Sequence, residues 1–173
     1  MPWTDLAITC AHLVLRPFTA ADADEALACI TPTLTRYLSF DPPADGQAFE
    51  AVWRGWLAGM ASGTDWNFVL RERGSGRFLG LLGLHRAHEA EPELGIWIRE
   101  DAHGKGHGRE AVAALAAWAR AQFAPRAFVY PVAEANTASR RIAQGLGGEV
   151  VARQQRPKYP AVVYRIPAAT LPE

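Results

Sequence analysis

The sequence predicts an α/β fold with a mixed sheet, in which one pair of strands is parallel and the others are antiparallel. A glycine-rich turn leads from a strand at 93–99 into a helix, and a buried strand at 127–132 follows. A helix between two neighbouring strands implies a parallel crossover. Apolar runs at 66–72 and 77–86 flank Gly74-Ser75-Gly76, which is typical of an antiparallel hairpin.

Turn signals and periodicity define the other elements. Leu13 and Leu15 alternate on one face of a strand, and Thr19 can cap the helix after it. The Pro42-Pro43 pair breaks the chain, and Asp45 can begin a further helix. In chain order, the expected elements are strand His12–Phe18, helix Ala20–Ile30, helix Asp45–Ala61, strands Trp66–Glu72, Arg77–Arg86 and Glu93–Arg99, helix Gly106–Gln122, strand Ala127–Val132, helix Asn136–Leu146, and strands Glu149–Gln155 and Ala161–Ile166.

The two longest helices are each expected to bury an apolar stripe. The stripes are Phe49, Val52, Trp53, Trp56 and Leu57 in the first, and Val112, Leu115, Ala116 and Ala119 in the second. We therefore interpret Trp53 and Trp56 as core or pocket-wall residues.

Composition bounds the class of protein. The chain has 173 residues, of which 49% are hydrophobic and 21% charged, so we expect one domain over residues 1–173. The formal net charge is zero, which argues against a nucleic-acid partner. No apolar run reaches transmembrane length and no signal pattern opens the chain, so we expect no membrane partner and a cytoplasmic location. Cys10 and Cys29 lack metal or redox spacing and are expected to be free thiols.

The most informative segment is the turn His103-Gly104-Lys105-Gly106-His107-Gly108, which opens into an alanine-rich helix. Its glycines leave backbone N–H groups free to crowd around an anion. The positive end of the helix dipole points at the same place. We expect a phosphate or pyrophosphate to bind here, the alternative being a flexible surface turn.

Two common phosphate loops do not fit this turn. A P-loop requires Ser or Thr directly after its lysine, whereas Gly106 follows Lys105. A Rossmann fingerprint requires G-x-G-x-x-G on the first strand–helix unit, and this turn is G-x-G-x-G past the middle of the chain.

The turn resembles the coenzyme A pyrophosphate loop of the GNAT superfamily of N-acyltransferases, with the pattern Q/R-x-x-G-x-G/A. His103 stands at the Gln or Arg position, and Gly106 and Gly108 match the glycines. The segment 136–147, NTASRRIAQGLG, is similar to the N-x-A-S-x-R-[VI]-x-x-x-L-G helix of the RimJ/RimL branch, followed here by Gly148 in place of an aromatic residue. The opening 13–18, LVLRPF, also resembles that branch, so the likeness extends over about residues 12–166.

This resemblance implies a mostly antiparallel sheet of about six or seven strands with helices on both faces, in which the parallel strands 93–99 and 127–132 splay apart. It implies acetyl-CoA as cosubstrate, with the pantetheine arm in the gap between those strands. Pro131 suits such an interrupted pairing. The implied coenzyme-binding residues are Ile96, Trp97, Ile98, His103, Gly104, Lys105, Gly106, His107, Gly108, Arg109, Asn136 and Ser139.

The resemblance also implies two catalytic residues. Glu93, on the strand before the loop, stands where the family places a base; its alternatives are a solvated carboxylate or a partner for Arg99. Ser139 stands where the RimJ/RimL branch places a hydroxyl near the thioester sulfur. The alternative for Ser139 is a first-turn residue of a helix capped by Asn136. The tyrosine that many GNAT enzymes use as an acid would fall near Ala143, so that route is absent.

Histidines leave other assignments open. His85 or His88 competes with Glu93 as the base. No third ligand has metal-binding spacing with His103 and His107, and we expect no metal.

The predicted function is acetyl transfer from acetyl-CoA to a primary amine, by direct attack in a ternary complex. The acceptor is a protein N-terminus or a small amine such as an amino acid, polyamine or antibiotic, and the protein is a monomer or homodimer. The alternative is a noncatalytic acyl-CoA sensor of the same fold.

Overall fold

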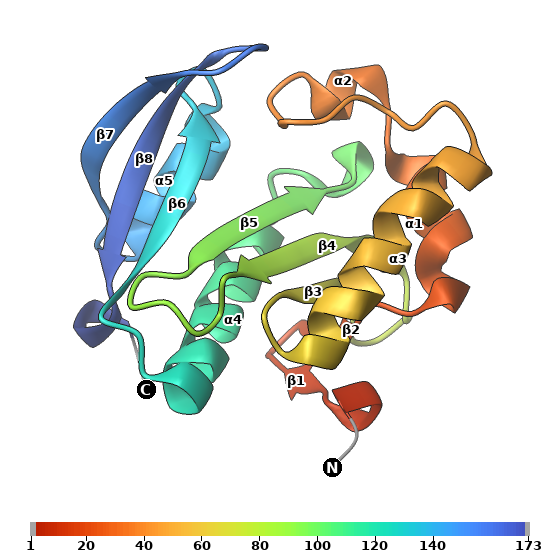
Figure 1. Cartoon of the computed structure of the whole chain (residues 1–173), viewed down its shortest axis with the longest axis horizontal. Coiled ribbons are helices and arrows are strands. Elements are labelled where there is room, and N and C mark those ends of the chain that lie inside the picture. Colours follow the sequence, from red (N-terminus) through yellow and green to blue (C-terminus); the bar gives the residue numbers. More distant parts are fainter. Residues whose placement is uncertain (1–2, 172–173) are drawn as a thin grey trace.

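The computed structural model describes residues 3–171, and its centre is one sheet of eight strands (Figure 1). The strands are β1 (Ile8–Thr9), β2 (Leu13–Pro17), β3 (Trp66–Glu72), β4 (Phe78–His85), β5 (Glu93–Ile98), β6 (Ala127–Ala133), β7 (Glu149–Gln155) and β8 (Pro160–Pro167). Their spatial order is β1-β2-β3-β4-β5-β6-β8-β7, and within these strands only β5 and β6 pair in parallel. The mixed, mostly antiparallel sheet is confirmed, and β1 adds a short edge strand to those expected.

The parallel strands β5 and β6 pair only near their start. Their register consists of Glu93 opposite Val129, and the Val129 N–H donates to the Pro92 carbonyl oxygen at 3.0 Å. Beyond this point β5 stays with β4 as far as Ile98, whereas β6 follows β8. The two strands therefore diverge, as Figure 1 shows, and the expected splayed pair is confirmed.

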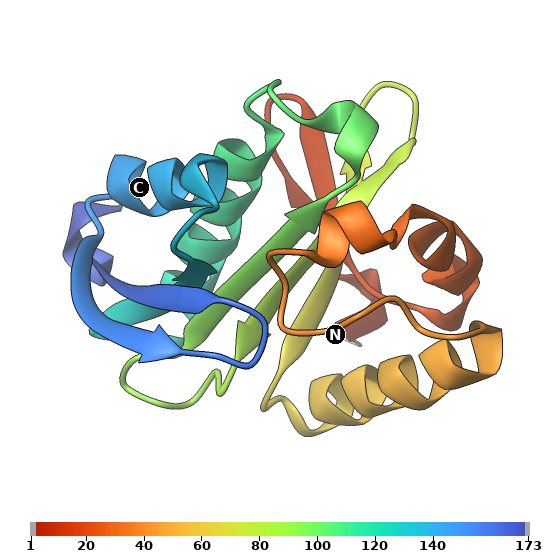
Figure 2. The same ribbon diagram turned by 90° about the horizontal axis from the view of Figure 1, so that it is seen from above.

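Helices cover both faces of the sheet (Figure 2). The helices are α1 (Ala23–Cys29), α2 (Pro32–Thr35), α3 (Gly46–Ser62), α4 (His107–Phe123) and α5 (Thr137–Gly145). Side chains alternate along a strand, so Leu82 and Leu84 of β4 join the core beneath α4, whereas Leu81 joins the core beneath α1 and α3. No helix within residues 3–171 is both long and apolar enough to cross a membrane.

The core beneath α3 is rich in aromatic rings. Phe18 and Phe49 meet the Trp56 ring edge to face, at centroid distances of 5.2 and 5.7 Å. Trp53 packs against the same cluster, as expected. Val52 does not: its side chain is 47% exposed, because it lies on the flank of the stripe that runs through Phe49 and Trp56.

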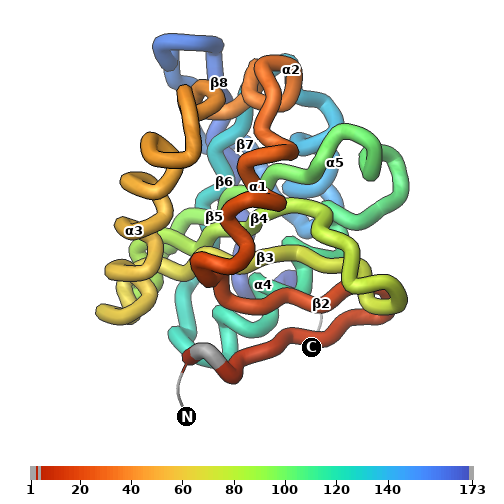
Figure 3. The backbone as a smooth tube through the Cα atoms, turned by 90° about the vertical axis from the view of Figure 1, so that its right-hand side faces the viewer, coloured from red at the N-terminus to blue at the C-terminus, as the bar shows by residue number. Residues whose placement is uncertain are grey.

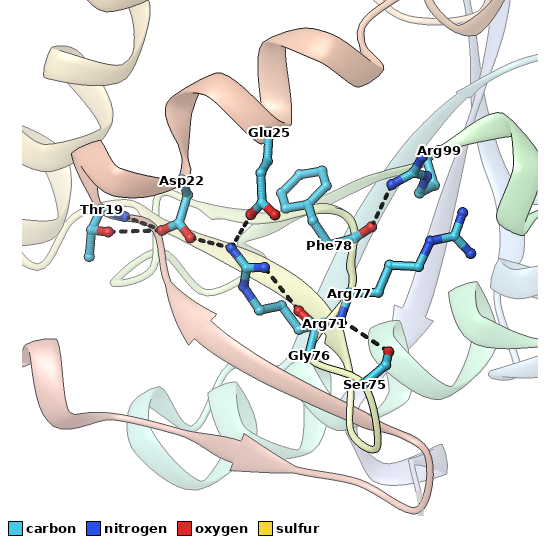
Figure 4. A network of polar contacts seen from close by, with 9 residues as sticks. All are labelled: Thr19, Asp22, Glu25, Arg71, Ser75, Gly76, Arg77, Phe78 and Arg99. Carbon is cyan, nitrogen blue, oxygen red and sulfur yellow. Dashed lines mark hydrogen bonds and ion pairs between the residues drawn. The ribbon is translucent and has the colours of Figure 1, made fainter.

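A polar network ties α1 to the β3–β4 hairpin (Figure 4). Arg71 of β3 donates to Asp22 Oδ1 at 2.8 Å, to the Glu25 carboxylate and to the Gly76 carbonyl oxygen at 3.0 Å. Asp22 also accepts from the backbone N–H and the hydroxyl of Thr19, both at 2.9 Å. The network fixes the start of α1, where a short 3₁₀ helix, Ala20–Asp22, replaces the first turn of the expected α-helix.

The same hairpin holds the segment that follows β5. Arg77 donates to Asp101 Oδ2 at 2.6 Å, and Arg99 donates to Asp101 Oδ1 at 2.6 Å. The hydrogen bond from Arg99 lowers the pKa of the Asp101 carboxyl. These bonds anchor the 3₁₀ helix Glu100–Ala102, which leads directly into the glycine turn.

The short helix α2 is an element that the sequence pattern did not predict. Thr31 caps it, since its Oγ1 accepts from the Leu34 N–H at 3.1 Å. Lys158, in the β7–β8 turn, donates to the carbonyl oxygens of Thr35 and Phe40 at 2.8 and 2.9 Å. Figure 3 shows this turn beside α2 and the loop that follows it, residues 31–40, which we call the α2 segment. Two distant parts of the chain thus meet above the splayed strands.

Candidate functional site

A cavity of about 760 Å³ lies between the α2 segment, the end of β5, the glycine turn and the start of α5. Its volume is within the range of small-molecule pockets. The residues expected from the sequence to bind coenzyme all line it: Ile96, Trp97, Ile98, His103, Gly104, Lys105, Gly106, His107, Gly108, Arg109, Asn136 and Ser139. The fold thus brings segments from the middle and the end of the chain to one cavity.

The glycine turn owes its shape to two left-handed residues. Gly104 and Gly106 have φ angles of +75° and +79°, which side-chain-bearing residues rarely adopt. A Cβ built on either would have no atom within 4 Å. The turn therefore exposes its backbone, and glycine is needed there for conformation rather than for packing.

Helix α4 begins at this turn without a side-chain cap. Gly106 is its N-cap and has no side chain to accept hydrogen bonds from the unpaired N–H groups of the first turn. Those donors and the positive end of the helix dipole would favour an anion at this place. Gly108 has a different role: a Cβ there would lie 2.7 Å from Ile142 Cδ1, so glycine allows α4 to start against α5.

The charged residues of the cavity lining are mostly cations. Among the described lining residues, Glu100 is the carboxylate, and the cations are Arg36, Lys105, Arg109 and Arg141. The Arg109 guanidinium lies beside Gly145, whose Cβ position is 3.6 Å from Arg109 Cζ. This charge complements a polyanionic ligand such as a nucleotide diphosphate.

The free edge of β5 presents the backbone of alternate residues to the gap. The Arg99 N–H donates to the Leu79 carbonyl oxygen of β4 at 2.8 Å. Since the direction of backbone groups alternates in an antiparallel ladder, Trp97 also faces β4, and Ile96 and Ile98 face the gap. The backbone groups of Trp97 thus face the β4 ladder, and the part of this residue in coenzyme binding, as one that lines the cavity, stays a prediction.

The His103 ring occupies one of the backbone acceptors on the free edge of β5. Its Nε2 lies 2.6 Å from the Ile98 carbonyl oxygen, so the ring donates to one of the groups that faces the gap. Across the gap, Val129 directs its N–H toward β5, and Pro131 places its nitrogen on the same edge. Because proline has no N–H, this edge of β6 leaves no orphan donor where the pairing ends. Ile96 is thus the residue of β5 best placed to pair with an extended ligand.

Ser139 and Asn136 occupy the start of α5. Asn136 Oδ1 accepts from the Ser139 N–H at 3.2 Å, which confirms the N-cap. The Ser139 Oγ lies 2.7 Å from the hydroxyl of Tyr130 on β6. Burial raises the pKa of Tyr130 to about 12, so its phenol is neutral at physiological pH. No local sequence pattern predicts this pairing, because it depends on how α5 packs against β6.

Glu93 lies at the closed end of the splay and does not line the cavity. Its Oε2 accepts from Arg86 Nη2 at 3.2 Å. Arg99, considered as its partner, binds Asp101 instead, because Asp101 is nearer along the chain after β5. The catalytic role of Glu93 stays a prediction.

The two histidines considered as bases have different surroundings. His85 stands opposite Glu93 in the β4–β5 register, and its Nδ1 lies 3.2 Å from Asp65 Oδ1. The His88 ring instead packs edge to face against Phe123 at the end of α4, at 5.3 Å. Residues 3–171 contain no cluster of three or more His, Cys, Asp or Glu that could hold a metal ion.

The α2 segment contributes lining residues that the sequence analysis missed. They are Thr33, Leu34, Arg36, Tyr37 and Leu38. The Arg36 guanidinium stacks over the Tyr37 ring, 4.7 Å from its centroid. The Thr31-Pro32 pair is a helix-start signal that could have located this segment.

Comparison with known proteins relates this arrangement to a family. A family model described as an acetyltransferase (GNAT) domain matches residues 12–149. No curated protein matches the chain by sequence.

Solved structures share the fold at low sequence identity. RimJ from Mycobacterium smegmatis, in complex with CoA-disulfide, is 18% identical with a TM-score of 0.82; the match covers 93% of this chain and 84% of that one. Spermidine N-acetyltransferase from Vibrio cholerae, in complex with CoA and spermine, is 14% identical with a TM-score of 0.81, covering 94% and 99%. Ribosomal-protein-S5-alanine acetyltransferase from Vibrio fischeri is 12% identical with a TM-score of 0.83, covering 98% and 100%.

Proposed function

The chain belongs to the GNAT acetyltransferase family, and we propose that it transfers an acetyl group from acetyl-CoA to a primary amine. The amine attacks the thioester directly while both substrates are bound. The proposal extends to a cytoplasmic location, where the protein acts as a monomer or homodimer.

The observation that carries the proposal is the continuity between the glycine turn and the gap in the sheet. The turn and the start of α4 offer N–H donors to a pyrophosphate, with cationic side chains around them. Ile96 and Ile98 lie between this anion site and the closed end of the splay at Glu93. An extended arm bound at the turn would thus direct a terminal thioester toward Glu93.

Three chemical requirements can be met around that end. Backbone N–H groups of β5 that face the gap can stabilise the oxyanion. The Ser139 hydroxyl can donate a hydrogen bond to the departing thiolate. A base must free the amine of its proton, and Glu93 and His85, opposite each other on β5 and β4, are the candidates there.

The acceptor is proposed at the level of its reacting group, a primary amine. Two fold relatives are named for the acetylation of a ribosomal protein and of spermidine. The acceptor here accordingly belongs to one of two classes, a protein N-terminus or a small amine such as a polyamine, amino acid or antibiotic.

A noncatalytic acyl-CoA sensor is the second candidate function. The engagement of Glu93 by Arg86, outside the cavity lining, favours it. Free thiol released from acetyl-CoA in the presence of a mixed amine panel separates the two functions. We expect amine-dependent release; tight acetyl-CoA binding with no release above the amine-free rate would identify a sensor.

A further inference from the structure

We propose that His85, oriented by Asp65, is the general base that takes the proton from the acceptor amine. This inference rests on the proposed acetyl transfer and assigns its proton acceptor. Asp65 acts as a positioning residue, since it touches His85 rather than the reacting atoms.

The Asp65–His85 pair fixes which imidazole nitrogen is free. His85 Nδ1 lies 3.2 Å from Asp65 Oδ1, and the same oxygen accepts from the Arg86 N–H at 3.3 Å. A carboxylate beside Nδ1 favours the tautomer that carries its proton there. The lone pair of a neutral ring is then on Nε2. Gly59 packs against Asp65, with a Cβ position 3.0 Å from Asp65 Cβ, so the end of α3 supports the carboxylate.

The His85 ring lies over a bare part of the sheet. A Cβ built on Gly83 would be 2.6 Å from His85 Nε2, so the ring uses the space that a side chain would fill. Gly83 stands opposite Gly95 in the β4–β5 register. A Cβ built on Gly95 would have no atom within 4 Å. Nε2 therefore borders an open space above Gly95, which leaves room for an amine.

This open space adjoins the expected thioester position. Gly95 lies between Glu93, where β5 and β6 are still paired, and Ile96, where the backbone begins to face the open gap. The side chains of His85 and Glu93 lie on the same face of the sheet as the Cα positions of Gly83 and Gly95, because these positions alternate with the buried Leu84 and Leu94. An acceptor approaching on that face would meet Nε2 and the thioester together.

The geometry favours His85 over Glu93. The Glu93 carboxylate is held by the Arg86 guanidinium, which also binds Glu89 at 3.3 Å. His85 has no comparable restraint on Nε2 within the described chain, and 39% of its side chain is exposed, so a proton can leave to solvent.

The proton balance is complete without another reactant. The acceptor ammonium gives one proton to Nε2, which releases it to water. The amine lone pair then forms the C–N bond, and the C–S bond breaks with its electrons on sulfur. The second nitrogen proton passes to Nε2, which is neutral again, and then to the thiolate, which becomes the free thiol.

The pH profile provides the test. The charged groups around His85 are Asp65 from the α3–β3 loop, Glu93 from β5 and Arg86 at the end of β4; β3 contributes the uncharged Asn67. A neutral imidazole can accept a proton and a protonated one cannot. Activity that depends on His85 as the base should therefore fall as the solution becomes acidic.

The first experiment measures amine-dependent thiol release from pH 5 to 9 for His85→Gln and Glu93→Gln. We expect His85→Gln to lower kcat by about 10²–10⁴-fold and to leave the acetyl-CoA Kd unchanged. The variant should also lose the fall in activity at low pH, which is the acid limb of the pH profile. Glu93→Gln should keep the acid limb. His88→Gln is the matched control, since that ring packs against Phe123. If His85→Gln keeps the acid limb and wild-type turnover, His85 is not the base, and the proposed acetyl transfer still stands. If the wild-type protein binds acetyl-CoA but releases no thiol, the proposed acetyl transfer is itself overturned.

The second experiment tests the positioning by Asp65 independently of turnover. Nitrogen-15 NMR of the intact protein should show neutral His85 protonated on Nδ1, and Asp65→Ala should shift the population toward Nε2. Gly83→Ala should displace the ring, because its Cβ would meet Nε2 at 2.6 Å, and should lower kcat while the melting temperature reports folding. A His85 tautomer that is the same in wild type and Asp65→Ala would contradict the role of Asp65.

Discussion

The Tyr130 hydroxyl lies 2.7 Å from Ser139 Oγ, linking the buried side of β6 to the first turn of α5. Because burial raises the pKa of Tyr130 to about 12, the phenol keeps its proton and can donate to the serine oxygen. The Ser139 hydroxyl is then free to donate in turn toward the cavity. In that arrangement, with the tyrosine as donor, the buried phenol directs the serine proton toward the cavity.

Removing either hydroxyl should lower turnover more than coenzyme affinity. A single hydrogen bond is typically worth about 1 kcal/mol, so we expect Ser139→Ala and Tyr130→Phe each to reduce kcat by roughly 5-fold. A contact made mainly with the leaving thiolate affects the rate rather than ground-state binding. Steady-state kinetics and acetyl-CoA titration check this. Normal kcat in Ser139→Ala would leave that serine as an ordinary first-turn residue.

Asn136→Ala should instead weaken coenzyme binding, and its melting temperature should be lower because the helix loses its cap. Acetyl-CoA titration and thermal unfolding of this variant check both effects.

Tyr130 also predicts a loss of stability in alkaline solution. Its pKa is raised from 10 to about 12 by burial, so the unfolded state releases the proton first as the pH rises. Below pH 10, ionisation of Tyr130 should add no pH dependence to the free energy of unfolding. Between pH 10 and 12, it should lower this free energy by up to about 3 kcal/mol. Tyr130→Phe should lack this part of the decline. Denaturant unfolding at a series of pH values measures this. If the free energy of unfolding falls equally with pH in wild type and Tyr130→Phe, the phenol is not buried and neutral.

A charged side chain in the glycine turn should prevent coenzyme binding. Gly106→Glu places a carboxylate where phosphate would approach and should raise the acetyl-CoA Kd by at least roughly 10-fold. Gly76→Glu is a matched control, because Gly76 has a φ of +72° and open space around its Cβ position, but lies in the β3–β4 turn. Calorimetric titration of both variants separates backbone strain from local charge. Equal affinities would place the phosphate site elsewhere.

Filling the space above Gly95 should affect the acceptor alone. Gly95 does not have a positive φ, and its Cβ position is open, so Gly95→Val should fold. We expect kcat/KM for the amine to fall by more than roughly 10-fold, since the side chain would occupy the space beside Nε2. Affinity for acetyl-CoA should stay close to wild type. A variant with wild-type amine kinetics would show that the acceptor approaches from another side.

The sequence predicts the long elements well because their signals are local. The stripe of α4 and the strands β3 and β7 follow from periodicity and turn residues within each segment. The strand β1 spans only Ile8–Thr9 and α2 only Pro32–Thr35, so neither is long enough for a period to show. Their place depends on partners elsewhere, such as Lys158 for the α2 segment.

The candidate site divides in the same way. The glycine turn carries its own chemistry, because Gly104 and Gly106 determine both its shape and its exposed N–H groups. The Tyr130–Ser139 and Asp65–His85 pairs each join different elements, and no local pattern relates their members. The direction of the Trp97 backbone likewise depends on its register with β4.

Acetyl transfer at this cavity is tested most sharply by thiol release from acetyl-CoA, measured with and without an amine panel, for wild type and Gly106→Glu. Acetyl transfer at this cavity predicts release that requires an amine, yields an acetylated amine in equal amount, and falls in Gly106→Glu in parallel with acetyl-CoA affinity. Wild-type protein that binds acetyl-CoA but releases no thiol with any amine would show that this protein does not transfer acetyl groups to amines.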